Sequence, residues 1–95
     1  MNKQEIKDIL DKSLNMPIGD VSDEWKPQTV VVGESDGVPF VQARAETWAK
    51  ASVLCAKVKD ALSEKYEVVQ LMVEFNPVDF RFWENVKVIN ENLQK

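Results

Sequence analysis

Residues 28–44, QTVVVGESDGVPFVQAR, contain two strand-forming runs on either side of a turn signal. Residues 28–33 are rich in β-branched side chains and predict one strand, and residues 39–44 predict the returning strand. Asp36 and Gly37 lie between the two runs. Asp-Gly favours a tight hairpin turn because both residues tolerate a positive φ. The stretch therefore predicts an antiparallel hairpin.

Two further segments predict helices. In residues 45–66 one apolar seam repeats at steps of three and four positions, and it consists of Trp48, Ala51, Cys55, Val58 and Leu62, with Tyr66 as its continuation. Residues 3–15 carry a shorter apolar face on a charged segment, which predicts an amphipathic helix. Residues 16–27 hold two prolines, a glycine and three acids, so they predict a connector to the hairpin.

The C-terminal third contains one clear segment and one ambiguous segment. Residues 67–75, EVVQLMVEF, alternate in the manner of a strand with at least one buried face. Residues 76–95 fit a helix capped by Asn76, with Pro77 in its first position and one shared apolar face. They also fit a strand after an Asn-Pro turn, but Glu84 interrupts the apolar face of that strand. The helix is therefore the preferred expectation.

These elements follow the order α-β-β-α-β-α within a single domain that spans residues 1–95. We expect an α+β fold, in which one small sheet, made of the hairpin and a third strand, packs against helices. A chain of 95 residues and 10.9 kDa is long enough for one modest hydrophobic core. It is too short for such a core together with a deep, enclosed active site.

Several chemistries are excluded by the composition. The chain contains no histidine and a single cysteine, Cys55, so imidazole catalysis, an internal disulfide and a zinc cluster are ruled out. We expect a protein that is not an enzyme and that holds neither a cofactor nor a metal. The first residues lack the apolar core of a signal peptide, and no apolar run could span a bilayer. We therefore expect a cytoplasmic protein without membrane contact.

The net charge of −4 is unevenly distributed along the chain. Residues 1–40 contain eight acids and four lysines, whereas acids and bases balance in residues 41–95. Direct nucleic-acid binding needs a basic surface, and the sequence shows none. An acidic front of this kind instead favours a partner protein with a basic surface.

Eight residues are candidates for partner binding. Five are acids of the connector and the hairpin tip: Asp20, Asp23, Glu24, Glu34 and Asp36. The other three belong to the aromatic C-terminal segment: Phe80, Arg81 and Trp83. Ordinary loop and turn chemistry would account for the acids, and burial in the core would account for the aromatics. In a helix, however, Phe80 and Phe82 lie about 160° apart, so one of them is expected at the surface.

The function expected from these features is that of a small acidic protein-interaction module. Such a module is a regulator, inhibitor or adaptor, of the type common in bacteria and their phages, and it acts by binding another protein. The alternative is a homo-oligomer that binds a small ligand in a pocket between protomers.

Overall fold

The computed structural model describes residues 2–91. Its elements in chain order are α1 (Lys3–Leu14), β1 (Ile18–Asp20), β2 (Thr29–Ser35), β3 (Val38–Ala45), α2 (Trp48–Ser63), β4 (Tyr66–Gln70), β5 (Glu74–Asn76) and β6 (Arg81–Glu91). The α+β class is confirmed. The expected order is wrong in part, because the described residues form two helices and a six-stranded sheet instead of three helices and three strands.

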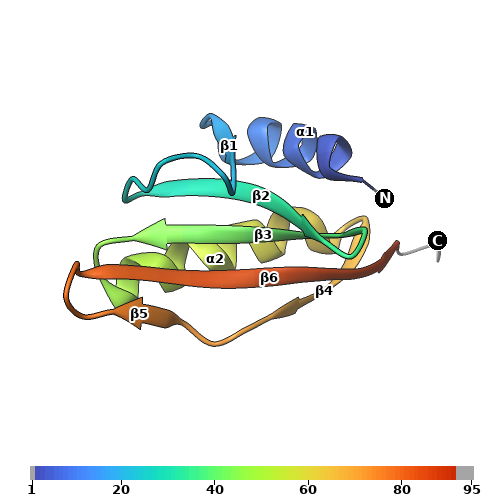
Figure 1. Cartoon of the computed structure of the whole chain (residues 1–95). Helices are drawn as coiled ribbons and strands as arrows, with labels where there is room; N and C mark the ends of the chain where they lie inside the picture. The colour runs from blue at the N-terminus through green and yellow to red at the C-terminus, as the bar shows by residue number, and fades with distance from the viewer. Residues whose placement is uncertain (1, 92–95) are drawn as a thin grey trace.

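The strands form one sheet in the order β1-β2-β3-β6-β4, and β5 also pairs with β6 (Figure 1). β1 and β2 are parallel, and every other pair is antiparallel. β6 therefore lies inside the sheet, where it pairs with β3 on one side and with β4 and β5 on the other. α2 packs against β3, β4 and β6, while α1 packs against α2 and the β1–β2 end of the sheet.

The predicted hairpin is confirmed as β2 and β3. Ser35 pairs with Val38, which leaves a two-residue turn at Asp36 and Gly37. Both turn residues have positive φ, 52° and 78°. This geometry matches the right-handed twist of the two strands, which explains why an Asp-Gly pair stands here.

The hydrophobic core lies between the helices and the sheet. Ala51, Cys55, Val58 and Leu62 of the predicted α2 seam are all buried. The seam prediction is wrong for Trp48, whose exposed fraction is 53%. Trp48 is the first residue of α2 and contacts the ring of Phe75 on the short strand β5, so no further layer of the protein covers it.

The preferred helix over residues 76–95 is wrong. Residues 81–91 form strand β6, and residues 92–95 of that prediction lie outside the described residues. Asn76 does accept a hydrogen bond from the backbone N–H of Val78, at 3.0 Å, but the contact closes a turn instead of capping a helix. Without residues 81–91, β3 and β4 would each have an edge of unpaired backbone N–H and C=O groups. As a strand, β6 pairs with both edges, which a helix could not do.

The strand predicted over residues 67–75 is present but interrupted. β4 ends at Gln70 and β5 begins at Glu74. The expected buried face is also wrong, since Val69, Leu71 and Phe75 are exposed and only Val68 packs against the core. The physical reason is that this segment lies at the edge of the sheet. The helices cover only one face of the sheet, so the side chains on the other face stay exposed.

Candidate partner-binding surface

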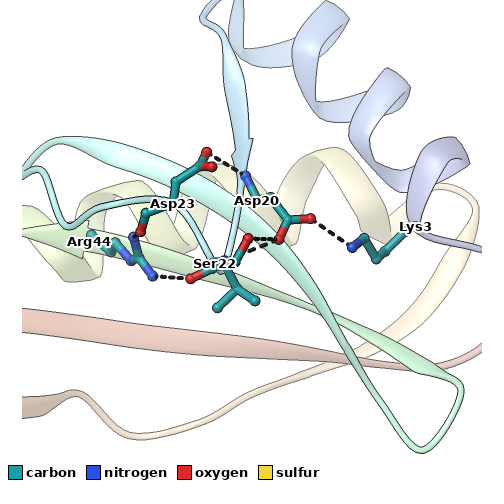
Figure 2. A network of polar contacts seen from close by, with 6 residues as sticks. Lys3, Asp20, Ser22, Asp23 and Arg44 are labelled. Carbon is teal, nitrogen blue, oxygen red and sulfur yellow. Dashed lines mark hydrogen bonds and ion pairs between the residues drawn. The ribbon is translucent and has the colours of Figure 1, made fainter.

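The sheet face opposite the helices is partly covered by the loop between β1 and β2. Arg44, a buried residue of β3, holds this loop in place (Figure 2). Its Nη2 donates to the backbone carbonyl of Val21 at 2.9 Å, and its Nη1 donates to that of Asp23 at 3.3 Å. Its Nε donates to Oε1 of Gln42 at 2.7 Å. Each guanidinium nitrogen of Arg44 therefore has an internal acceptor, and the residue has a structural role.

Two of the predicted acidic site residues are engaged within the same loop. The Asp20 carboxylate accepts a hydrogen bond from Lys3 Nζ at 2.7 Å and further bonds from the backbone N–H and hydroxyl of Ser22 (Figure 2). These bonds, that to Lys3 foremost, hold the pKa of Asp20 well below its ordinary value of 3.8. The Asp23 carboxylate accepts from the backbone N–H of Asp20 at 2.9 Å. The carboxylates of Asp20 and Asp23 are therefore already engaged in hydrogen bonds within the protein that stabilise the loop.

The remaining three acids are exposed. Glu24 lies in the β1–β2 loop, while Glu34 and Asp36 lie at the tip of the β2–β3 hairpin. The negative charge of Glu34 helps to raise the pKa of Lys3, which places it within electrostatic reach of the Lys3–Asp20 pair. These acids are available to attract a basic surface, but they do not form a pocket.

Arg81 and Trp83 belong to an aromatic cluster that the sequence analysis missed. The ring of Trp25, from the β1–β2 loop, meets Trp83 edge to face at a centroid distance of 5.8 Å. The guanidinium groups of Arg44 and Arg81 lie 5.1 and 5.4 Å from the Trp25 ring. These contacts hold the β1–β2 loop against the sheet. A tryptophan within the connector of residues 16–27 was the signal that could have revealed it.

Phe80 lies apart from this cluster, in the turn between β5 and β6. Its exposed fraction is 71%, and its φ is 54°. The left-handed region costs an L-residue about 1–2 kcal/mol, and a bulky residue is seldom found there. A phenylalanine that is both strained and exposed contributes little to folding. The prediction that one of Phe80 and Phe82 is a surface aromatic is confirmed, although the turn and not a helix is the cause.

Several apolar residues along this edge of the sheet are exposed, Val69 and Leu71 among them. We call the five around β5 the apolar rim, and they are Trp48, Met72, Phe75, Val78 and Phe80. Met72 and Val78 have exposed fractions of 81% and 83%. Four of the five come from residues 72–80, on β5 (Figure 1) and the turns around it. Trp48 contacts Phe75 at a centroid distance of 6.5 Å. Exposed apolar patches on soluble proteins commonly mark interaction sites.

The same edge is acidic. Residues 66–80 contain Glu67, Glu74 and Asp79 and no lysine or arginine. Asp79 lies 3.8 Å from Nε of Arg81, whereas no ion pair of the described residues involves Glu67 or Glu74. The apolar rim is therefore bordered by two acids, Glu74 and Asp79, and by one base, Arg81, which lies next to Asp79.

An open hollow of about 440 Å³ occupies the uncovered sheet face beside the hairpin. Phe40 and Leu71 supply apolar parts of its wall, and Gln42, Asn85 and Lys87 supply polar parts. Gln42 donates to Oδ1 of Asn85 at 3.2 Å, so these two amides are partly satisfied by each other. The acidic and cysteine side chains of residues 2–91 form no group able to hold a metal ion.

Glu84 is the one buried carboxylate of the described chain, and it lies on the helix side of β6. Gln70 donates to its Oε2 at 2.6 Å, while its Oε1 has no hydrogen-bond partner. Its charge also acts on the Cys55 thiol. The group is enclosed by α2 and the sheet, so it offers nothing to a ligand at the surface.

Comparisons with known proteins give no relative. No family model matches the chain, and no curated protein and no solved structure matches it significantly. Neither helix in the described part of the chain has the length and apolar character needed to cross a membrane.

Proposed function

We propose that this chain is a small acidic protein-interaction module that binds a partner protein through the apolar rim. The observation that carries the proposal is Phe80, which combines a left-handed backbone with an exposed fraction of 71%. Strain of this kind persists where the surrounding structure enforces it, and it is concentrated at functional sites. Exposed aromatic anchors are also the residues that dominate binding energy in protein interfaces.

The expected partner presents an apolar patch bordered by basic residues. Glu74 lies on β5 beside the rim residue Phe75, without an ion-pair partner among the described residues, and a basic partner would complement it. Glu24, Glu34 and Asp36 add exposed negative charge that speeds the approach of such a partner. A regulator, inhibitor or adaptor role, without catalysis, a cofactor, or membrane or nucleic-acid contact, fits this surface. A cytoplasmic location fits the single free cysteine.

The binding mode is side-chain docking and not the addition of a partner strand to the sheet. The outer strands β4 and β5 are five and three residues long. The register of β4 shifts between Glu67 and Val68, and Glu74 adds a charge on β5. Short, irregular and charged edge strands are the features that prevent edge-to-edge pairing. The rim side chains are therefore the better source of affinity.

The test compares binding with stability in the variant Phe80→Gly. Glycine adopts a positive φ without strain, so the free energy of unfolding should stay equal or rise by up to about 1 kcal/mol. A photo-crosslinking residue at Val78 first identifies the partner, which is then purified and titrated against the parent by calorimetry. Loss of the Phe80 ring should weaken binding by about tenfold or more.

Val53→Ala is the matched control, because Val53 is an exposed apolar residue of α2 outside the apolar rim. This variant should bind as the parent does. Equal affinities of the parent and Phe80→Gly would overturn the proposal. A crosslink from Val78 that yields only a second copy of this chain, or no product at all, would also overturn it.

The alternative, a homo-oligomer that binds a small ligand, has one feature in its favour. The hollow beside the hairpin is open, and a second protomer could close it. Sedimentation equilibrium separates the two functions. A mass near 10.9 kDa favours the interaction module, and twice that mass with Phe40 protected favours the alternative.

A further inference from the structure

Residues 2–91 contain three sulfur-bearing side chains, and one of them is largely open to solvent. Cys55 is fully buried in the core, and Met16 is partly buried and packs against that core. Met72, between β4 and β5, has an exposed fraction of 81%. Oxidation of sulfur in a folded protein depends on access, so a dissolved oxidant should react with Met72 before the other two.

We propose that oxidation of Met72 to methionine sulfoxide regulates the apolar rim, an inference that rests on the proposed function. The oxidant is a peroxide. Hydrogen peroxide transfers one oxygen atom to the thioether sulfur, so that its O–O bond breaks, an S=O bond forms, the sulfur loses two electrons and water is released. Methionine sulfoxide reductases reverse the modification, so it can act as a switch.

The modification changes the chemistry of the rim. Methionine is a flexible apolar side chain of the kind that adapts to the surface of a partner, whereas its sulfoxide is polar. Met72 belongs to the segment 72–80, which supplies four of the five rim residues. An S=O group buried in the interface without a hydrogen-bond partner would disfavour binding.

The fold should tolerate the same modification. Met72 lies between the end of β4 at Gln70 and the start of β5 at Glu74, and it is absent from the core cluster and from the residues packed against it. Changes to an exposed side chain of this kind alter stability little. Oxidation should therefore change the surface without unfolding the protein, and a partner that covers Met72 should slow its oxidation.

The first test needs no partner. The folded protein is treated with hydrogen peroxide, and the oxidation of each methionine is followed by peptide mapping in a mass spectrometer. Met72 should be oxidised several-fold faster than Met16, whereas the two rates should become equal in denaturant. At a peroxide dose that leaves Met16 intact, the melting temperature should equal that of the untreated protein. Equal rates in the folded protein, or a lowered melting temperature, would overturn the inference.

The second test measures affinity by calorimetry, with the partner identified through the Val78 crosslink. Oxidation at Met72 should weaken binding roughly fivefold or more, the effect expected from burying an unpaired polar group. Treatment with methionine sulfoxide reductases should restore the affinity. Met72→Leu is the matched control, because leucine is apolar, of similar size and without sulfur. Its affinity should equal that of the parent and should stay unchanged after peroxide.

Two results of the second test would overturn the inference. One is an oxidised parent that binds as tightly as the untreated parent. The other is a Met72→Leu variant that loses affinity in peroxide as the parent does, because another residue would then be responsible. The Phe80→Gly experiment decides the proposed function separately. If Phe80→Gly weakens binding and oxidation does not, the rim remains the binding surface and only the regulatory role of Met72 is lost.

Discussion

Cys55 lies on the face of α2 that packs against the sheet, and it is fully buried. Burial, followed by the nearby charge of Glu84, raises the pKa of its thiol to about 12. The thiolate is the reactive form of cysteine, so almost none of the reactive form exists in the folded protein at neutral pH.

We therefore expect a thiol reagent to label the native protein slowly at pH 8. In denaturant the thiol is exposed and regains an ordinary pKa, so labelling should be complete within minutes. The absorbance of the released chromophore measures both rates. Rapid, stoichiometric labelling of the native protein would show that the packing of α2 on the sheet is wrong.

The helical seam made the burial of Cys55 predictable, but the same pattern misplaced Trp48. Periodicity tells which residues share a face, and it does not tell how far the opposing layer extends. The layer ends at the short strand β5, so Trp48 projects beyond the core and becomes part of the apolar rim. The residue that sequence analysis assigned to the core is therefore part of the candidate site.

At the scale of the elements, β6 is where the sequence analysis failed. Val86, Ile89 and Leu93 are spaced as on one face of a helix, whereas Val86 and Val88 alternate as on one face of a strand. Local pattern alone cannot separate these two periods in such a segment. The decision comes from β3 and β4, whose backbone groups need a partner and lie far away in the sequence.

Two alanine substitutions distinguish the strand from the helix. Val88 is fully buried and the exposed fraction of Ile89 is 41%. Val88→Ala should lower the free energy of unfolding by about 2 kcal/mol, since it removes buried apolar surface and leaves a cavity. Ile89→Ala should cost less than about 1 kcal/mol. Urea denaturation measures both values, and the opposite ranking would favour the helix.

The hairpin and the two helices, by contrast, could be predicted because their signals are local. Asp36-Gly37 fixes the turn, and the first helix ends at Asn15, whose left-handed backbone closes it. Of the candidate site, it could be predicted that one of Phe80 and Phe82 is a surface aromatic, although not which of the two. The joining of Trp25 to Trp83 could not be foreseen, because it depends on how the β1–β2 loop folds over the sheet.

For the whole molecule, the balance of charge sets the response to acid. At neutral pH the net charge is −4, and protonation of the acids leaves twelve lysines and arginines that repel one another. Asp20 adds a specific contribution, because its pKa is lowered in the folded state by Lys3 and Ser22. Folding therefore favours the ionised form of Asp20. The stability that results is complete above pH 3.8 and is lost as the pH falls further.

We expect the free energy of unfolding to decrease as the pH is lowered from about 4 to 2. Asp20→Asn keeps the size of the side chain and removes its titration, so the variant should show a shallower decrease. Thermal unfolding followed by circular dichroism across this range measures the difference. Asp11→Asn is the matched control, since Asp11 is an exposed acid of α1, and its profile should follow that of the parent. Parallel profiles for the parent and Asp20→Asn would contradict the role of the Lys3–Asp20 pair.

The place of β6 between β3 and β4 also affects how the chain folds as it leaves the ribosome. Every other described element precedes β6 in the sequence, yet β3 pairs with it on one side and β4 and β5 on the other. Until residues 81–91 have been made, the nascent chain has a hairpin and two helices but no strand to join β3 to β4. During that interval the edge of β3 stays unpaired and α2 lacks its contacts with β6, so both are open to aggregation or to a chaperone.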